Sequence, residues 1–193
     1  MSVQVGIVGS AGGNISDEAY DKAVQLGHAL TRFGCTVITG ACPGLPDAAA
    51  RAAREAGALC VGISPALSRN EHREVYKSPW DCYDVMIYTG SGLMGREVQL
   101  IRSSHAVVIL GGRSGTLGEF AIAYDEAKLI GAVLGTGGVA DYLPELLATI
   151  DKDTGADVVI DADPRALVEK MMEKHKERVE RGVAFRGPIV HDG

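Results

Sequence analysis

The sequence predicts an α/β fold in which a mostly parallel, doubly wound sheet carries helices on both faces. Short β-branched runs alternate with longer stretches of helical periodicity, and a βαβαβ order is complete by residue 64. The chain has 25 glycines, which cluster directly after apolar runs, where tight strand-to-helix turns require them. Its 193 residues, 46% of them hydrophobic, are enough to bury the core of such a sheet.

The first third of the chain supplies three strands, predicted over 3–8, 35–39 and 59–64. Ser16 is a suitable N-cap for the helix after the first strand, and Gly34 ends that helix. The alanine-rich run 48–56 predicts a second helix, whose small side chains allow a close approach to the sheet.

Residues 65–84 are polar and irregular, and they carry Tyr76, Trp80 and Tyr83. A connection of this length is often a lid or a binding loop. A surface excursion packed by its own aromatic side chains explains the same composition equally well. The sequence leaves both interpretations open.

The second half of the chain continues the alternation. The predicted elements are strands over 85–88, 106–109, 130–134 and 158–160, helices over 93–103, 117–128 and 142–150, and a last helix opened by Asp163 and Pro164. Periodicity places Met94, Val98 and Ile101 on the apolar face of the helix 93–103, with Arg96 and Glu97 off that stripe. In the next helix, the apolar face is expected to hold Leu117, Phe120, Ala121 and Tyr124.

Composition limits the class of protein. We expect one domain over 1–181, followed by a C-terminal tail over 182–193. No apolar run reaches 18 residues and no signal peptide is recognisable, so we expect a cytoplasmic protein without a membrane partner. The net charge of −6 argues against nucleic acid as a partner. The four cysteines and five histidines lack ligand spacing, so reduced core thiols and no metal site are expected.

Glycine-rich turns follow the first, second, fourth and fifth predicted strands. In a parallel sheet these turns lie at the carboxyl edge, where open α/β folds bind their ligands. The turn 110–119 (LGGRSGTLGE) leads from a buried strand into a helix, an arrangement in which free backbone N–H groups converge on an anion. Neither a strict G-x-G-x-x-G in the first turn nor a Walker A motif occurs, so a dinucleotide dehydrogenase and a P-loop ATPase fit poorly.

Two residues of this region also have purely structural interpretations. Thr116 and Glu119 form the T-x-x-E pattern of a capping box, in which both side chains satisfy backbone N–H groups at a helix start. Arg96 can be an exposed helix arginine paired with a neighbouring carboxylate.

Taken together, residues 90–96 (GSGLMGR), the apolar strand after them and residues 111–119 resemble the LOG family of cytokinin-activating nucleoside 5′-monophosphate phosphoribohydrolases. The family's P-G-G-x-G-T-x-x-E motif falls on 111–119, and its catalytic arginine falls on Arg96. The resemblance extends over about residues 3–160. It implies a modified Rossmann fold, a homodimer or higher homo-oligomer, and a small phosphorylated ligand.

The resemblance also implies the roles of individual residues. Arg96 and Glu119 are the implied catalytic pair, with the glutamate acting at the ribose. The expected phosphate- or nucleotide-binding residues are Gly9, Ser10, Gly40, Ser91, Gly92, Gly112, Arg113, Ser114, Gly115 and Thr116. No cofactor is expected to be required, and a nucleotide or phosphate is expected to be bound.

The chain departs from the LOG pattern at three positions. Gly111 replaces the motif proline, Arg113 replaces its second glycine, and Glu97 stands where a lysine commonly follows the catalytic arginine. A related branch, the molybdenum cofactor carrier proteins, has a comparable loop and binds without cleaving, and the chain resembles it as well. Two hypotheses follow: a hydrolase that cleaves the N-glycosidic bond of an AMP-like nucleotide to base and ribose 5-phosphate, and a non-catalytic nucleotide or molybdopterin carrier or sensor.

Overall fold

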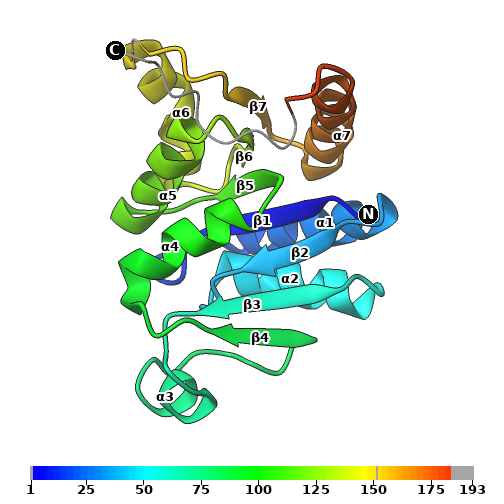
Figure 1. The fold of residues 1–193 in the computed structure, drawn as a ribbon. Helices are drawn as coiled ribbons and strands as arrows, with labels where there is room; N and C mark the ends of the chain where they lie inside the picture. Colours follow the sequence, from blue (N-terminus) through cyan, green and yellow to red (C-terminus); the bar gives the residue numbers. More distant parts are fainter. Residues whose placement is uncertain (1, 151, 184–193) are drawn as a thin grey trace.

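The computed structural model describes residues 2–150 and 152–183 and contains a seven-stranded, all-parallel sheet (Figure 1). The strands are β1 (Gln4–Gly9), β2 (Thr36–Thr39), β3 (Cys60–Ser64), β4 (Val85–Tyr88), β5 (Ala106–Leu110), β6 (Leu129–Val133) and β7 (Asp157–Asp161). Their order across the sheet is β4-β3-β2-β1-β5-β6-β7. The predicted α/β class with a parallel, doubly wound sheet is confirmed.

Helices cover both faces of the sheet (Figure 1). They are α1 (Asp17–Arg32), α2 (Leu45–Glu55), α3 (Arg69–Glu74), α4 (Gly92–Arg102), α5 (Ser114–Asp125), α6 (Gly138–Thr149) and α7 (Pro164–Glu180). One core lies between the sheet and α1, α2 and α7, and the other between the sheet and α4, α5 and α6. The short α3 lies beyond the edge strand β4 (Figure 1).

The strand order reverses next to β1, which pairs with β2 on one side and with β5 on the other. The register aligns Gly9 with Leu110, so β1 and β5 end together, and Thr39 ends β2 opposite Ile7 at the same edge of the sheet. Such a reversal opens a crevice at the carboxyl edge of a doubly wound sheet. The turns after β1, β2 and β5 therefore meet at one place.

The prediction for the apolar face of α4 is wrong in part. Met94 is 76% exposed, whereas Arg96 and Glu97 are buried together with Ile101. Periodicity assigns the buried face by assuming an apolar neighbour. The inward face of this helix instead meets a polar crevice at the carboxyl edge of the sheet, so its charged residues turn inward.

The expected apolar face of α5 is also shifted. Leu117 is 42% exposed and Ala121 is exposed, while Phe120 and Glu119 are buried. The cause is the same as in α4, because the first turns of α5 face the crevice and only its later turns face the apolar core.

Several element boundaries differ from the predicted ones. Helix α2 begins at Leu45, three residues early, because Gly44 supplies a φ of 90° and Pro46 fits the first turn. Helix α6 begins at Gly138 instead of residue 142. The C-terminal tail was predicted over 182–193, and its residues after Val183 lie outside the described residues.

The segment 65–84 is pinned by its own side chains. His72 is fully buried, and its Nδ1 accepts a hydrogen bond from the Ser64 hydroxyl at 2.8 Å, while its Nε2 donates to the Pro79 carbonyl at 2.9 Å. The guanidinium of Arg69 lies 3.7 Å from the ring centre of Trp80. These contacts fit a self-packed surface excursion and not a free lid.

Candidate functional site

A cavity of about 390 Å³ lies at the carboxyl edge of the sheet, between the turns after β1 and β2 and the helices α4 and α5. Its walls combine backbone from the glycine turns with charged side chains from the helices. The lining residues are Ile7, Val8, Gly9, Ser10, Ala11, Gly40, Cys42, Pro46, Leu93, Arg96, Glu97, Arg113, Ser114, Gly115, Thr116 and Glu119. This volume is in the range of small-molecule sites, about 300–1,000 Å³.

Most of the expected site residues line this cavity, and three do not. Gly112 supports the wall from behind, because its N–H donates to the Ser10 hydroxyl at 2.7 Å. Ser91 and Gly92 lie outside the lining. The Ser91 hydroxyl instead donates to Gln99 at 3.0 Å, within α4.

Ser10 joins three turns through three separate atoms. Its N–H donates to the Leu110 carbonyl at 2.9 Å, and its own carbonyl accepts from the Leu45 N–H at 2.9 Å. Its hydroxyl accepts from Gly112, as described above. The inner wall of the cavity is therefore one hydrogen-bonded unit.

The turn after β5 opens α5 without a side-chain cap. Gly112 has a φ of 107°, and a Cβ there would lie 2.4 Å from the Thr116 side chain. The N-cap residue is Arg113, whose side chain makes no capping hydrogen bond. The capping-box interpretation is wrong, since Glu119 points to Arg96 instead. The first N–H groups of α5, at the positive end of the helix dipole, thus face the cavity without a side-chain acceptor.

Arg96 and Glu119 form a buried ion pair. The Nη1 atom of Arg96 donates to Oε1 of Glu119 at 3.1 Å, and each side chain is 8% exposed. Gly40 makes room for the guanidinium, since a Cβ there would lie 2.3 Å from Nη1. The interpretation of Arg96 as an exposed surface arginine is therefore wrong.

The electrostatics of this pair favour a glutamate that titrates near neutrality. Burial raises the pKa of Glu119 to about 7, with Glu97 adding to the rise and Arg96 opposing it. The Nε atom of Arg96 is buried and has no hydrogen-bond partner among the described residues. A buried donor of this kind is costly unless a ligand or water accepts from it.

Sequence reasoning missed Cys42 and Glu97 as lining residues. Cys42 was expected to be a core thiol, but it is half-buried, and its Sγ lies 3.8 Å from Nη2 of Arg96. Burial raises the pKa of this thiol. Ala41, just before it, has the unusual φ of 51°, which turns the chain into the cavity. The position of Cys42 in the second glycine turn is the signal that could have identified it.

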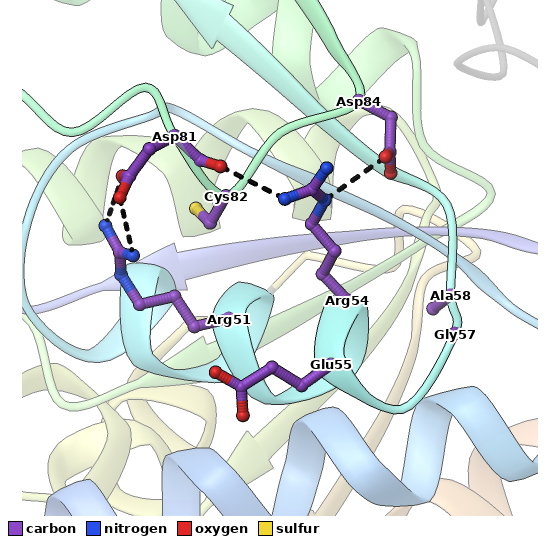
Figure 2. Close-up of a pocket in the computed structure, with 8 residues that line it drawn as sticks. All are labelled: Arg51, Arg54, Glu55, Gly57, Ala58, Asp81, Cys82 and Asp84. Carbon is purple, nitrogen blue, oxygen red and sulfur yellow. Dashed lines mark hydrogen bonds and ion pairs between the residues drawn. The ribbon is translucent and has the colours of Figure 1, made fainter.

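A second hollow, of about 560 Å³, lies between α2 and the segment before β4 (Figure 2). Arg51 donates to both carboxylate oxygens of Asp81 at 3.2 and 2.6 Å, and Arg54 donates to Asp84 at 3.2 Å. Each cation is already paired with a carboxylate, so the hollow offers no unpaired positive charge to an anion. These ion pairs fasten the end of the segment 65–84 to α2.

In the described ranges, no three His, Cys, Asp or Glu side chains gather as possible metal ligands. Among the helices of 2–150 and 152–183, none has the length and apolar character needed to cross a bilayer.

This chain is similar to several known proteins, among them the following three. An uncharacterized protein of Archaeoglobus fulgidus is 30% identical over 131 residues, which is 68% of this chain and 80% of that protein. The structure of TM1055 has 27% identity and a TM-score of 0.76, and the match covers 89% of this chain and 99% of that chain. The molybdenum cofactor binding protein of the phototrophic bacterium Rippkaea orientalis has 26% identity and a TM-score of 0.70, with 93% and 98% covered.

The last of these structures corrects one expectation. We expected that no cofactor is required. A neighbour with the same fold is a protein that binds the molybdenum cofactor, and this finding contradicts the expectation.

Residues 2–168 match the SLOG cluster4 family. This match covers most of the chain, and it supports the sequence resemblance at the level of this family and of its shared fold, not at the level of LOG activity. The chain belongs to the SLOG cluster4 family.

Proposed function

We propose that the protein is a carrier that holds a phosphorylated small molecule in the cavity at the carboxyl edge of its sheet. The ligand class that we propose is a phosphorylated pterin, of which the molybdenum cofactor is one. The observation that carries the proposal is the buried, unpartnered Nε of Arg96 beside an α5 N-terminus that no side chain caps.

The phosphate is the first part of the ligand that these residues explain. The free N–H groups of Ser114, Gly115 and Thr116 attract an anion through hydrogen bonds and the helix dipole. Arg113 is exposed at the start of α5, and its Nη1 lies 3.7 Å from the Cβ that Gly13 lacks, so its guanidinium stands beside the turn after β1. A guanidinium there adds a charge-assisted contact to a phosphate.

The cavity fits a cofactor of the molybdopterin class in size and in chemistry. Its volume of about 390 Å³ suits a small ligand, and its walls offer donors at α5 and Arg96 and an acceptor at Glu97. Arg96 and the α5 N–H groups would hold the oxygen atoms of the ligand, and Glu97 its N–H groups. When bound, such a cofactor supplies molybdenum redox chemistry. The similarity to the protein of Rippkaea orientalis supports this ligand class.

A second function is favoured by one specific observation, the pKa of about 7 for Glu119. A carboxylate with this pKa is suited to general-base catalysis at neutral pH. In hydrolysis of a nucleoside 5′-monophosphate, the C1′–N bond breaks with its electrons leaving on the base. Water then adds to C1′ and gives one proton to Glu119. The departing base takes a proton from bulk water, and Glu119 returns its proton to the solvent. Arg96 would orient the carboxylate.

One pair of measurements tests both functions. Binding of a pterin monophosphate and of AMP is measured by calorimetry, and release of free adenine from AMP by chromatography. The carrier hypothesis expects binding that falls at least about tenfold in Arg96→Gln, because a charged hydrogen bond is lost. The matched control is Arg54→Gln, which removes a cation from the other hollow and should bind like the wild type.

The two functions predict different outcomes for Glu119→Gln. Release of adenine by the wild type that is abolished in this variant would establish the hydrolase and overturn the purely non-catalytic reading. Binding without release establishes the carrier. If neither ligand binds, the proposed site is wrong.

A further inference from the structure

Glu97 is a largely buried residue beside the ion pair of Arg96 and Glu119. Its carboxylate takes no part in that pair. The residue is 7% exposed and lines the cavity. Its Oε1 lies 3.5 Å from the Cβ that Gly115 lacks, and its Oε2 lies 3.5 Å from the Cβ that Gly118 lacks. The described residues form no hydrogen bond and no ion pair with this side chain. The carboxylate thus lies against α5, beside these two glycines.

The energetics of this position call for a ligand with hydrogen-bond donors. Burial raises the pKa of Glu97, and the nearby Arg96 lowers it. Arg96 is already engaged with Glu119, and the α5 dipole attracts a carboxylate without donating to this one. The Glu97 oxygens are not among the fully enclosed polar atoms without a partner, so they are open to the cavity, and an ionised carboxylate can only accept. Neutral N–H groups of a ligand would compensate it.

The same carboxylate repels a phosphate, although it contacts α5 at Gly115 and Gly118. A phosphate is therefore favoured on the side of the α5 start that Arg113 occupies, and a neutral group with hydrogen-bond donors is favoured next to Glu97. A carboxylate has two oxygen atoms side by side and pairs best with two neighbouring donors.

We propose that Glu97 selects ligands carrying a 2-amino-4-oxopyrimidine ring, the ring shared by guanine and pterins, by accepting hydrogen bonds from its ring N–H and its exocyclic amine. Adenine presents an amine next to a ring acceptor, and hypoxanthine has the N–H without the amine. Both would leave one carboxylate oxygen unpaired. Glu97 is thus a specificity-determining residue, and this inference rests on the proposed binding of a phosphorylated ligand.

The test compares four ligands by isothermal titration calorimetry: GMP, IMP, AMP and a pterin monophosphate. The wild type should bind GMP about 10- to 100-fold more tightly than IMP or AMP, which is the effect of losing a hydrogen bond to a charged group. The pterin monophosphate should share this preference. Tighter binding of GMP would identify the ligand as a guanine nucleotide, and tighter binding of the pterin monophosphate would identify it as a pterin.

The informative variant is Glu97→Gln, for which the ratio of GMP to IMP affinity should fall close to one. The affinity for AMP should stay equal or rise, because the substitution removes one negative charge from the cavity that takes a phosphorylated ligand. Glu145→Gln, an exposed glutamate on α6, is the matched control and should keep the wild-type ratio. The ratio is independent of any general loss of folded protein.

Two results would overturn the inference while leaving the proposed function intact. One is equal binding of GMP, IMP and AMP by the wild type, and the other is an unchanged GMP preference in Glu97→Gln. If none of the four ligands binds, the proposed function fails as well.

Discussion

Glu119→Gln should change how the stability of the protein depends on pH. Burial raises the pKa of Glu119 from its ordinary 4.5 to about 7 in the folded protein. Between these two pH values the folded state keeps a proton that the unfolded state has released. The unfolded state then binds fewer protons, so the free energy of unfolding falls as pH rises.

The magnitude follows from the two pKa values. At about 1.4 kcal/mol per pH unit, a rise from 4.5 to about 7 corresponds to roughly 3 kcal/mol. This stability is fully present below pH 4.5 and is lost above pH 7. The side chain is 8% exposed, so solvent screening reduces the effect little. Glutamine does not titrate, and the variant should lack this loss.

The assay is urea denaturation followed by far-UV circular dichroism at half-unit steps from pH 4.5 to 8. The wild-type free energy of unfolding should fall relative to that of Glu119→Gln by about 3 kcal/mol across this range. Titration of the groups that do not interact with Glu119 cancels in the difference. Glu145→Gln should track the wild type. A difference that changes by less than about 1 kcal/mol refutes the argument that burial dominates the titration of Glu119.

Three further substitutions have defined outcomes. Gly112→Ala places a Cβ 2.4 Å from Thr116 at a φ of 107°, so GMP binding measured by calorimetry should weaken at least about tenfold; unchanged affinity would show that this turn does not shape the site. Arg178→Met removes a buried arginine, 5% exposed, that donates to two backbone carbonyls and one carboxylate, and urea denaturation should show a loss of about 3–5 kcal/mol. Ser64→Ala leaves Nδ1 of the buried His72 without its donor and should lower the free energy of unfolding by about 1–3 kcal/mol in the same assay. Wild-type stability of Arg178→Met or of Ser64→Ala would contradict the structural role given to that residue.

The fold was predictable because its signals are local. A β-branched run such as 106–109 has few alternatives once a glycine turn follows it, and parallel pairing follows from helices between successive strands. The six-residue helix α3 was missed because one turn and a half leave too little periodicity to detect.

The site was predictable only where its residues share a motif. Arg96 and Glu119 are 23 positions apart and on different helices, so their pairing could be inferred from a resemblance but not from spacing. The burial of Glu97 was not predictable, because hydrophobic periodicity reports on an apolar core and not on a polar cavity. For the same reason the exposure of Met94 was missed, since an apolar side chain looks alike whether it faces the sheet or solvent.

The three hydrogen bonds of Ser10 hold the inner wall of the cavity in place. They tie the turns after β2 and β5 to the turn after β1, so none of these turns can swing aside without breaking at least one of the hydrogen bonds. Two other lining residues have exposed side chains, Leu93 at 51% exposure and Arg113. The inner wall of the cavity is thus fixed by hydrogen bonds, whereas the exposed side chains of Leu93 and Arg113 can change rotamer.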